Sequence, residues 1–277
     1  MNRNFELPAG EDAVLRCSHF PARNKAKSLI VIAHGYKGFK DWGMFPYLAA
    51  SLSRDHEVIS FNFSHAGIGE DLQNFTELEK FARNTYNREI KDMEILLSYL
   101  SQHHKFGALP LFLLGHSRGG GDSLLYALDH PDELAGVISW NGITNLDLFT
   151  DEQKHEMKTL GRSHVLNGRT GQQMPLDAVL IEDLEHQAER YNILERMKSA
   201  SFPVILIQGT EDGERLRQGS AQLIKLRPDI EWVQIAGGNH TFCTVHPFIG
   251  STPQLEQAIA ASEAFIDHTL AARNSTL

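Results

Sequence analysis

The sequence predicts an α/β protein in which a mainly parallel central sheet carries helices on both faces. Three observations lead to this fold class. Apolar runs of strand length recur along the 277 residues, segments with helical spacing separate them, and the runs show no polar alternation. A strand buried on both faces reads as such a continuous run. Strands that alternate regularly with helices indicate a parallel sheet.

The first third of the chain supplies a hairpin, two strands and two helices. Residues 4–20 are expected to form the hairpin, because a Pro-Ala-Gly-Glu-Asp turn separates two strand-like runs. Buried strands follow at 28–33 and 58–63. Between them, Asp41 is expected to cap a helix whose apolar residues recur every three or four positions. A long helix beginning near Tyr86 comes next.

The stretch at 109–121 is the one around which the rest of the chain is organised. An apolar strand at 109–114 leads into Gly-His-Ser-Arg-Gly at 115–119, and further glycines open a helix. Gly-x-Ser-x-Gly between a strand and a helix is typical of a nucleophile elbow, a strained turn that exposes the serine hydroxyl. Gly115 and Gly119 permit the turn, because a Cβ at either place would collide with the neighbouring element. This context favours a nucleophilic Ser117 over an ordinary turn.

The second half continues the alternation with one interruption. Further strands are expected at 134–140, 202–209 and 230–235, and a closing helix from about residue 253. The roughly sixty residues before 202 are polar, with a tight hairpin turn expected at 166–169 and a helix from Met174 towards 197. We expect one domain over 1–277, with a loosely packed cap at about 142–198 inserted after the sixth strand.

A serine nucleophile requires a base and an acid later in the chain. His240 lies in a glycine-rich turn after the last predicted strand, and Asp212 lies three residues past the glycine that ends the preceding strand. A general base next to the serine and an acid next to the base are what activation of a neutral hydroxyl needs. Glu211 and Glu214 are alternative acids, because they flank Asp212.

The oxyanion hole requires two backbone N–H groups that converge on one point. Arg118 offers one, because the first turn of a helix leaves its amides unpaired and its dipole favours negative charge. Tyr36 offers the second, because it follows His34-Gly35 at the end of the first buried strand.

This order of motifs resembles the α/β-hydrolase superfamily over residues from about 12 to 270. Within the superfamily it is similar to the dienelactone hydrolase-like and prolyl-oligopeptidase-like branch of esterases and acyl-peptidases. The resemblance implies that Ser117 is the nucleophile, His240 the base and Asp212 its orienting acid. It implies oxyanion donors at Tyr36 and Arg118. The chain departs from dienelactone hydrolases proper in having serine where they have cysteine. It also departs from the usual pattern just after the acid, where apolar and proline residues are replaced by Gly-Glu-Arg.

These features predict a serine hydrolase that cleaves a carboxylic ester of a small to medium acyl group without a cofactor. Peptide or acyl-peptide cleavage and thioester hydrolysis remain alternatives, because the same groups perform them. A non-enzymatic binding protein on this fold is a further alternative, which the complete residue set disfavours. In the cap, Arg162, His164 and Arg169 either meet an anionic substrate or face water.

Composition narrows the remaining function classes. A net charge of -9 argues against nucleic acid or an anionic membrane as the main partner. No stretch approaches the roughly 18 apolar residues of a membrane span. Residues 1–10 have no apolar core of a signal peptide, so a cytoplasmic location is expected. Cys17 and Cys243 are expected to stay reduced, and the histidines lack metal-ligand spacing. The oligomeric state is not legible in the sequence.

Overall fold

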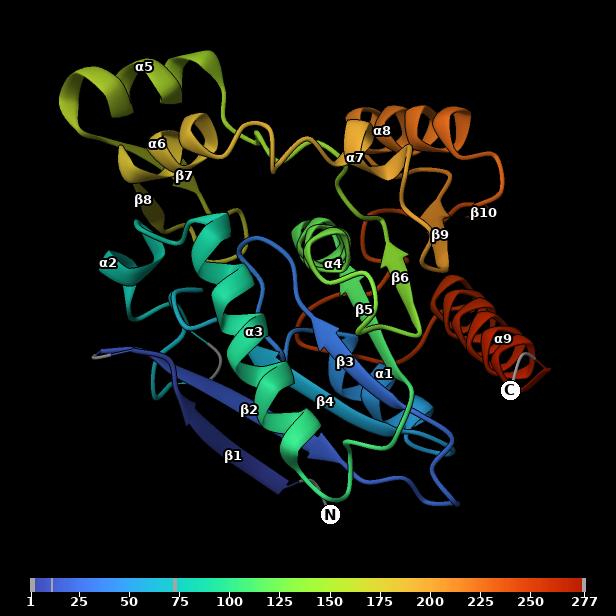
Figure 1. The fold of residues 1–277 in the computed structure, drawn as a ribbon. Coiled ribbons are helices and arrows are strands. Elements are labelled where there is room, and N and C mark those ends of the chain that lie inside the picture. Colours follow the sequence, from blue (N-terminus) through green and yellow to red (C-terminus); the bar gives the residue numbers. More distant parts are fainter. Residues whose placement is uncertain (1–2, 11, 72–73, 276–277) are drawn as a thin grey trace.

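The computed structural model describes residues 3–10, 12–71 and 74–275. Within these residues an eight-stranded sheet has the order β1-β2-β4-β3-β5-β6-β9-β10 (Figure 1). Its strands are β1 (Arg3–Pro8), β2 (Val14–Phe20), β3 (Leu29–Ala33), β4 (Glu57–Asn62), β5 (Leu111–His116), β6 (Gly136–Trp140), β9 (Val204–Gly209) and β10 (Glu231–Ile235).

The predicted mainly parallel sheet is confirmed. All pairs from β4 to β10 are parallel, while β2 runs antiparallel to both β1 and β4. The expected hairpin at 4–20 is this antiparallel edge. Ala33 pairs with Gly115, and His116 pairs with Trp140. Strands β3, β5 and β6 therefore end at one edge of the sheet, where their loops meet.

Helices cover both faces of the sheet. One face carries α1 (Phe45–Leu52) and α9 (Pro253–Ser275), which bury Leu48 and Ile259 against Ile32. The other carries α3 (Tyr86–Gln102), α4 (Arg118–Asp129) and α8 (Glu214–Leu226), packed around Val31 and Leu113. Because Val31 and Ile32 point to opposite faces, β3 contributes to both clusters.

The expected cap of α1 is wrong. The helix begins at Phe45 after Met44, and a proline stands in its first turn, where a fixed φ favours the start of a helix. Asp41 lies in the preceding turns and its carboxylate instead pairs with Lys40 Nζ at 2.6 Å.

The segment between β6 and β9 forms an insertion. It contains α5 (Asp151–Leu160), β7 (Arg162–Leu166), β8 (Gln173–Asp177), α6 (Val179–His186) and α7 (Ile193–Met197). The helix expected from Met174 is wrong, because 173–177 pairs with β7 as a strand. Met174 and Leu176 alternate towards an apolar cluster, and this period of two belongs to a strand. The hairpin is present, but its connection spans 167–172 and is longer than the expected tight turn.

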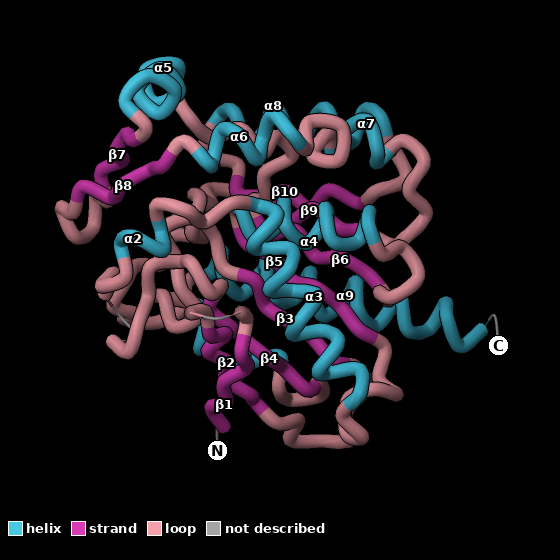
Figure 2. The backbone as a smooth tube through the Cα atoms, turned by 60° about the vertical axis from the view of Figure 1, so that its left-hand side comes forward, coloured by secondary structure: helices cyan, strands magenta, loops and turns pink. Residues whose placement is uncertain are grey.

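The insertion is also better packed than its polar composition suggested. Met157, Met174 and Leu176 are fully buried in a third cluster, together with Phe39 and Phe75 from loops of the main domain. The expectation of a loosely packed lid is therefore wrong for the described residues. The apolar side chains are few, but they converge on one place. Figure 2 shows the β7–β8 hairpin beside α2 (Leu78–Phe81), apart from the main sheet.

Candidate active site

Ser117 occupies a strained turn between β5 and α4. Its backbone has φ 57° and ψ -118°, a conformation that a non-glycine residue adopts only at a cost. A Cβ on Gly115 would lie 2.0 Å from the carbonyl oxygen of Gly119, and one on Gly119 would lie 2.4 Å from that of Ala33. The two glycines are therefore needed for the close approach of α4 to the sheet, and they leave the serine side chain accessible.

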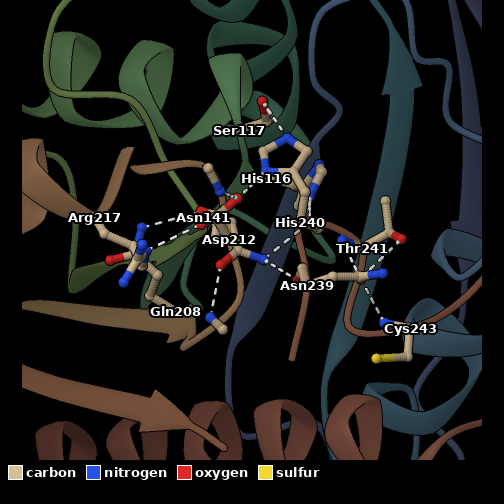
Figure 3. Close-up of polar contacts among 12 residues, drawn as sticks. His116, Ser117, Asn141, Gln208, Asp212, Arg217, Asn239, His240, Thr241 and Cys243 are labelled. Atoms are coloured by element: carbon tan, nitrogen blue, oxygen red, sulfur yellow. Dashed lines mark hydrogen bonds and ion pairs between the residues drawn. The ribbon is translucent and has the colours of Figure 1, made fainter. Parts of the chain in front are cut away.

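A continuous series of hydrogen bonds joins Ser117, His240 and Asp212 (Figure 3). His240 Nε2 lies 2.9 Å from Ser117 Oγ, and His240 Nδ1 lies 2.7 Å from Asp212 Oδ1. The structure thus brings together the three residues on which the sequence reasoning converged. It places the alternative acids elsewhere: Glu211 is exposed, and the Glu214 carboxylate accepts a hydrogen bond from its own helix.

Asp212 is held in its ionised form. Burial acts to raise the pKa of this carboxyl, but hydrogen bonds from His240, Gln208 and the Gly213 amide outweigh burial and lower the pKa below its ordinary value. An ionised carboxylate accepts the Nδ1–H of His240, which leaves Nε2 free to accept a proton from Ser117. The imidazole therefore has the tautomer that a general base requires.

The loop after β3 lies against the elbow. A Cβ on Gly35 would lie 2.9 Å from Ser117 Cβ, so Tyr36, the next residue, is adjacent to the serine. In the part of the chain that the structure describes, neither the Tyr36 amide nor the Arg118 amide donates to a backbone carbonyl or a side chain. Two unpaired donors beside a nucleophile are the requirement of an oxyanion hole.

A buried ion pair with Glu89 holds the side chain of Arg118. Arg118 Nε donates to Glu89 at 2.6 Å, and both side chains are 3% exposed. The guanidinium lies 3.9 Å from the ring centroid of Tyr86 and 5.5 Å from that of Tyr36. Burial, with the charge of Glu89, raises the pKa of nearby Asp122 well above its usual range, so this carboxyl stays neutral. Sequence reasoning considered only the backbone of Arg118 and missed this cluster.

Two further residues that sequence reasoning missed hold the loop of His240. Asn141 Nδ2 donates to the His240 carbonyl at 2.9 Å, while its Oδ1 accepts the Gly209 amide at 2.9 Å. His116 Nε2 lies 2.7 Å from the same carbonyl. Burial, followed by the charge of His240, lowers the pKa of His116 to about 3, so His116 is neutral and donates this bond. For Asn141, the sequence offered one signal of this role: a polar residue directly after a buried strand.

One cavity of the described residues lies outside this arrangement. It has a volume of about 560 Å³ and is bounded by the loop after β6, the α6–α7 segment and α8. Its walls include Leu146, Tyr191 and Leu216, but neither Ser117 nor His240. The cavity therefore does not open directly onto the reacting groups.

Two other kinds of site are absent from the described residues. None of the described helices combines the length and the apolar character that a bilayer crossing requires. The described histidines, cysteines and carboxylates form no group of three or more placed to hold a metal ion.

The chain matches the model of a known protein family and several known proteins. Residues 24–191, more than half of the chain, match the family model described as serine aminopeptidase, S33. Monoglyceride lipase of Rattus norvegicus is 29% identical over 147 residues, which cover 53% of this chain and 44% of the relative. The human enzyme is 29% identical over 153 residues, which cover 55% and 46%. The match spans somewhat less than half the length of these curated relatives.

Solved structures extend the likeness to the whole fold. Est1E from Butyrivibrio proteoclasticus superposes with a TM-score of 0.71 at 14% identity, covering 97% of this chain and 99% of that one. A soluble variant of monoglyceride lipase from Saccharomyces cerevisiae gives 0.72 at 16%, covering 97% and 95%. Dienelactone hydrolase from Anabaena variabilis gives 0.64 at 14%, covering 96% and 97%, which shows a shared fold and leaves the dienelactone branch a prediction. With its family match and this fold, the protein belongs to the serine aminopeptidase S33 family of α/β hydrolases.

Proposed function

We propose that the protein is a serine hydrolase that cleaves a carboxylic ester of a small to medium acyl group through an acyl-enzyme on Ser117. The hydrogen-bonded series Ser117–His240–Asp212 on a strained elbow carries the proposal. The names of similar proteins point to the same bond, because they include monoglyceride lipases and an Est1E structure with bound ferulic acid.

The chemistry follows from the positions of the three side chains. His240 Nε2 removes the proton of Ser117 as Oγ attacks the carbonyl carbon of the ester. The tetrahedral intermediate collapses, the carbon–oxygen bond to the alcohol breaks, and His240 returns the proton to the leaving oxygen. Water then attacks the acyl group with His240 again as the base, which releases the acid and restores the serine. Asp212 keeps the imidazole oriented and stabilises the imidazolium in both steps.

The amides of Tyr36 and Arg118 are the proposed oxyanion donors. Both are unpaired beside Ser117, and the Arg118 amide opens helix α4, where the dipole favours a negative charge. Each such donor stabilises the tetrahedral intermediate by roughly 3 kcal/mol.

We assign the insertion at about 142–198 to covering the substrate as part of one domain over 1–277. Two contacts support this role. Lys37, next to Tyr36, donates to the carbonyl of Leu166 in the hairpin at 3.1 Å, and the hairpin shares an apolar cluster with Phe39 of the same loop. Substrate that enters beside Tyr36 therefore meets the hairpin.

A series of 4-nitrophenyl esters from acetate to laurate tests the proposal, with aminoacyl 4-nitroanilides and an acyl thioester in parallel. The expected result is a maximum of kcat/KM among short and medium acyl esters, with Ser117→Ala reduced to the residual level of binding alone. Faster turnover of the nitroanilides or the thioester than of every ester would replace the proposed substrate class. Ester turnover that survives in Ser117→Ala would remove the proposed nucleophile.

A further inference from the structure

Two cations meet where the tip of the β7–β8 hairpin lies against the loop after β3: Lys37 from the loop and Arg169 from the hairpin. Lys37 Nζ donates to the Leu166 carbonyl at 3.1 Å, across 129 positions of sequence. The Arg169 guanidinium lies 5.7 Å from the ring centroid of Phe39 and 6.0 Å from that of Phe75. Both cations therefore sit where the insertion meets the main domain.

This junction is close to the nucleophile. A Cβ on Gly35 would lie 2.9 Å from Ser117 Cβ, so the backbone of this loop approaches the nucleophile closely. Lys37 is two residues further along the loop, so its Cα is at most about 7.6 Å from that of Gly35. On the other side, the Gly43 amide donates to His246 Nδ1 at 2.9 Å, and His246 belongs to the loop that carries the catalytic histidine. Lys37 therefore lies on the loop that approaches Ser117, and His246 lies on the loop that carries the base of Ser117.

Neither cation has a carboxylate partner in the described part of the chain. Lys37 is half-buried, burial alone lowers its pKa, and its hydrogen-bond acceptor is a neutral carbonyl. Its φ of 54° is one that glycine would adopt at lower cost, yet the position holds a lysine. Arg162, in the same hairpin, differs in this respect: it pairs with Asp177 at 2.6 Å and with Glu79 at 2.7 Å. Of the two arginines that the sequence singled out, only Arg169 remains available.

The charge of Arg169 acts on a neighbouring histidine of the His240 loop. Burial and the positive charge of Arg169 lower the pKa of His246, so the field of the guanidinium reaches this ring. Trp42 stacks on His246 with ring centroids 5.9 Å apart, and Phe39 meets the same ring edge-on. The junction between the hairpin and the loop after β3 is therefore aromatic and positively charged, in a chain whose net charge is -9.

We propose that Arg169 and Lys37 form a subsite for an anionic group on the ester substrate, with the carboxylate as its probe. The inference rests on the proposed function and names the substrate class of the same site. The guanidinium offers a planar pair of N–H donors that matches a carboxylate, and the ammonium adds a second charge-assisted bond. The aromatic rings contact the carbon skeleton between the ester and the anion.

Matched ester pairs test the subsite on both sides of the scissile bond. Mono-4-nitrophenyl adipate and its methyl ester place the carboxylate, or its neutral form, in the acyl part. The second pair, 4-acetoxybenzoate and its methyl ester, places it in the alcohol part. The quantity measured is the ratio of kcat/KM for the anionic ester to that for its neutral partner. The variants are Arg169→Gln and Lys37→Gln, with Lys225→Gln as the control, because Lys225 is an exposed cation on α8.

We expect the anionic member of at least one pair to be preferred. Arg169→Gln should lower the ratio about three- to tenfold, mainly through KM, as expected for a partly exposed charge-assisted contact. Added salt should lower the ratio as well, because it screens the charges. Lys225→Gln should leave both rates unchanged. A ratio that is insensitive to Arg169 and Lys37 overturns the subsite, while turnover of the neutral esters keeps the proposed function. If neither pair is hydrolysed and Ser117 takes no active-site label, both proposals fall.

Discussion

Removal of the Asn141 side chain is expected to impair both stability and catalysis. This buried amide joins the end of β9 to the loop of His240, because it accepts from the Gly209 amide and donates to the His240 carbonyl. Asn141 also has φ 46°, a left-handed conformation that asparagine tolerates better than alanine. Alanine and glycine variants therefore separate the two contributions, since both lose the amide but only alanine keeps the backbone strain.

The structure supplies the expected magnitudes. Leaving the buried Gly209 amide unpaired costs about 1–3 kcal/mol. A left-handed alanine adds roughly 1 kcal/mol, so Asn141→Ala should be less stable than Asn141→Gly by about that amount. His116 still donates to the His240 carbonyl, so the loop loosens without being released. A displacement approaching 1 Å at a reacting group lowers the rate by about 10²-fold, so we expect kcat to fall between about 10- and 100-fold in both variants.

The assay combines thermal unfolding with steady-state kinetics on 4-nitrophenyl butyrate. Each kcal/mol lost should lower Tm by about 2–4 °C in a chain of this size. The change in rate should appear in kcat, because Asn141 is buried and acts through the loop of His240. Asn145→Ala is the matched control, since Asn145 is exposed in the same loop. Full kcat in both Asn141 variants would refute the positioning role. A fully active glycine variant beside an inactive alanine variant would assign the effect to the backbone alone.

Three more outcomes are expected. Asp212→Asn should lower kcat by about 10⁴-fold, because the imidazole of His240 is no longer held in the required tautomer. Glu211→Gln and Glu214→Gln should leave kcat nearly unchanged. A larger loss of kcat in either glutamine variant would assign the role of the acid to that glutamate. Burial raises the pKa of Asp92 to about 7. The folded chain therefore keeps a proton that the unfolded chain releases from about pH 4, and stability should fall as pH rises from about 4 to 7. Asp92→Asn should make that slope shallower in urea unfolding, while buried Asp122, whose pKa is also raised, keeps a slope of the same sign. An unchanged slope would contradict the assignment. Residues 168–171 include two glycines with open space around them. Replacing these four residues with Gly-Ser residues should change KM and the preference for the acyl-chain length of the ester. A fall in kcat alone would mean that the hairpin supports the reacting groups.

Most of the fold could be predicted because local sequence patterns are enough to locate its strands and helices along the chain. Each strand of the main sheet is a short run of residues that can be recognised from its own sequence. The glycines around Ser117 likewise indicate the tight turn that they form. The acid and base were found from their place after β9 and β10. The β8 strand was misread because Met-Pro-Leu at 174–176 is short, and a proline near its start is also typical of a helix. Packing against Phe39 and Phe75 decides this segment.

The supporting residues could not be predicted, because their partners are remote in sequence. Glu89 meets Arg118 across 29 positions, and Asn141 meets His240 across 99. No periodicity or motif marks such pairs. Arg169 illustrates the same limit, because the sequence shows a cation in a polar segment. Only the structure places it over the aromatic rings of another loop.

Labelling with a fluorophosphonate tests the central claim most directly, because only an activated serine reacts rapidly with it. Intact-mass analysis and peptide mapping should find one label per chain on Ser117, with loss of esterase activity in proportion to labelling. Ser117→Ala should take up no label, and Asp212→Asn should react far more slowly, because His240 is no longer held as a base. A label on another residue, or a catalytically active chain that stays unlabelled, would contradict the assignment of Ser117 as the nucleophile.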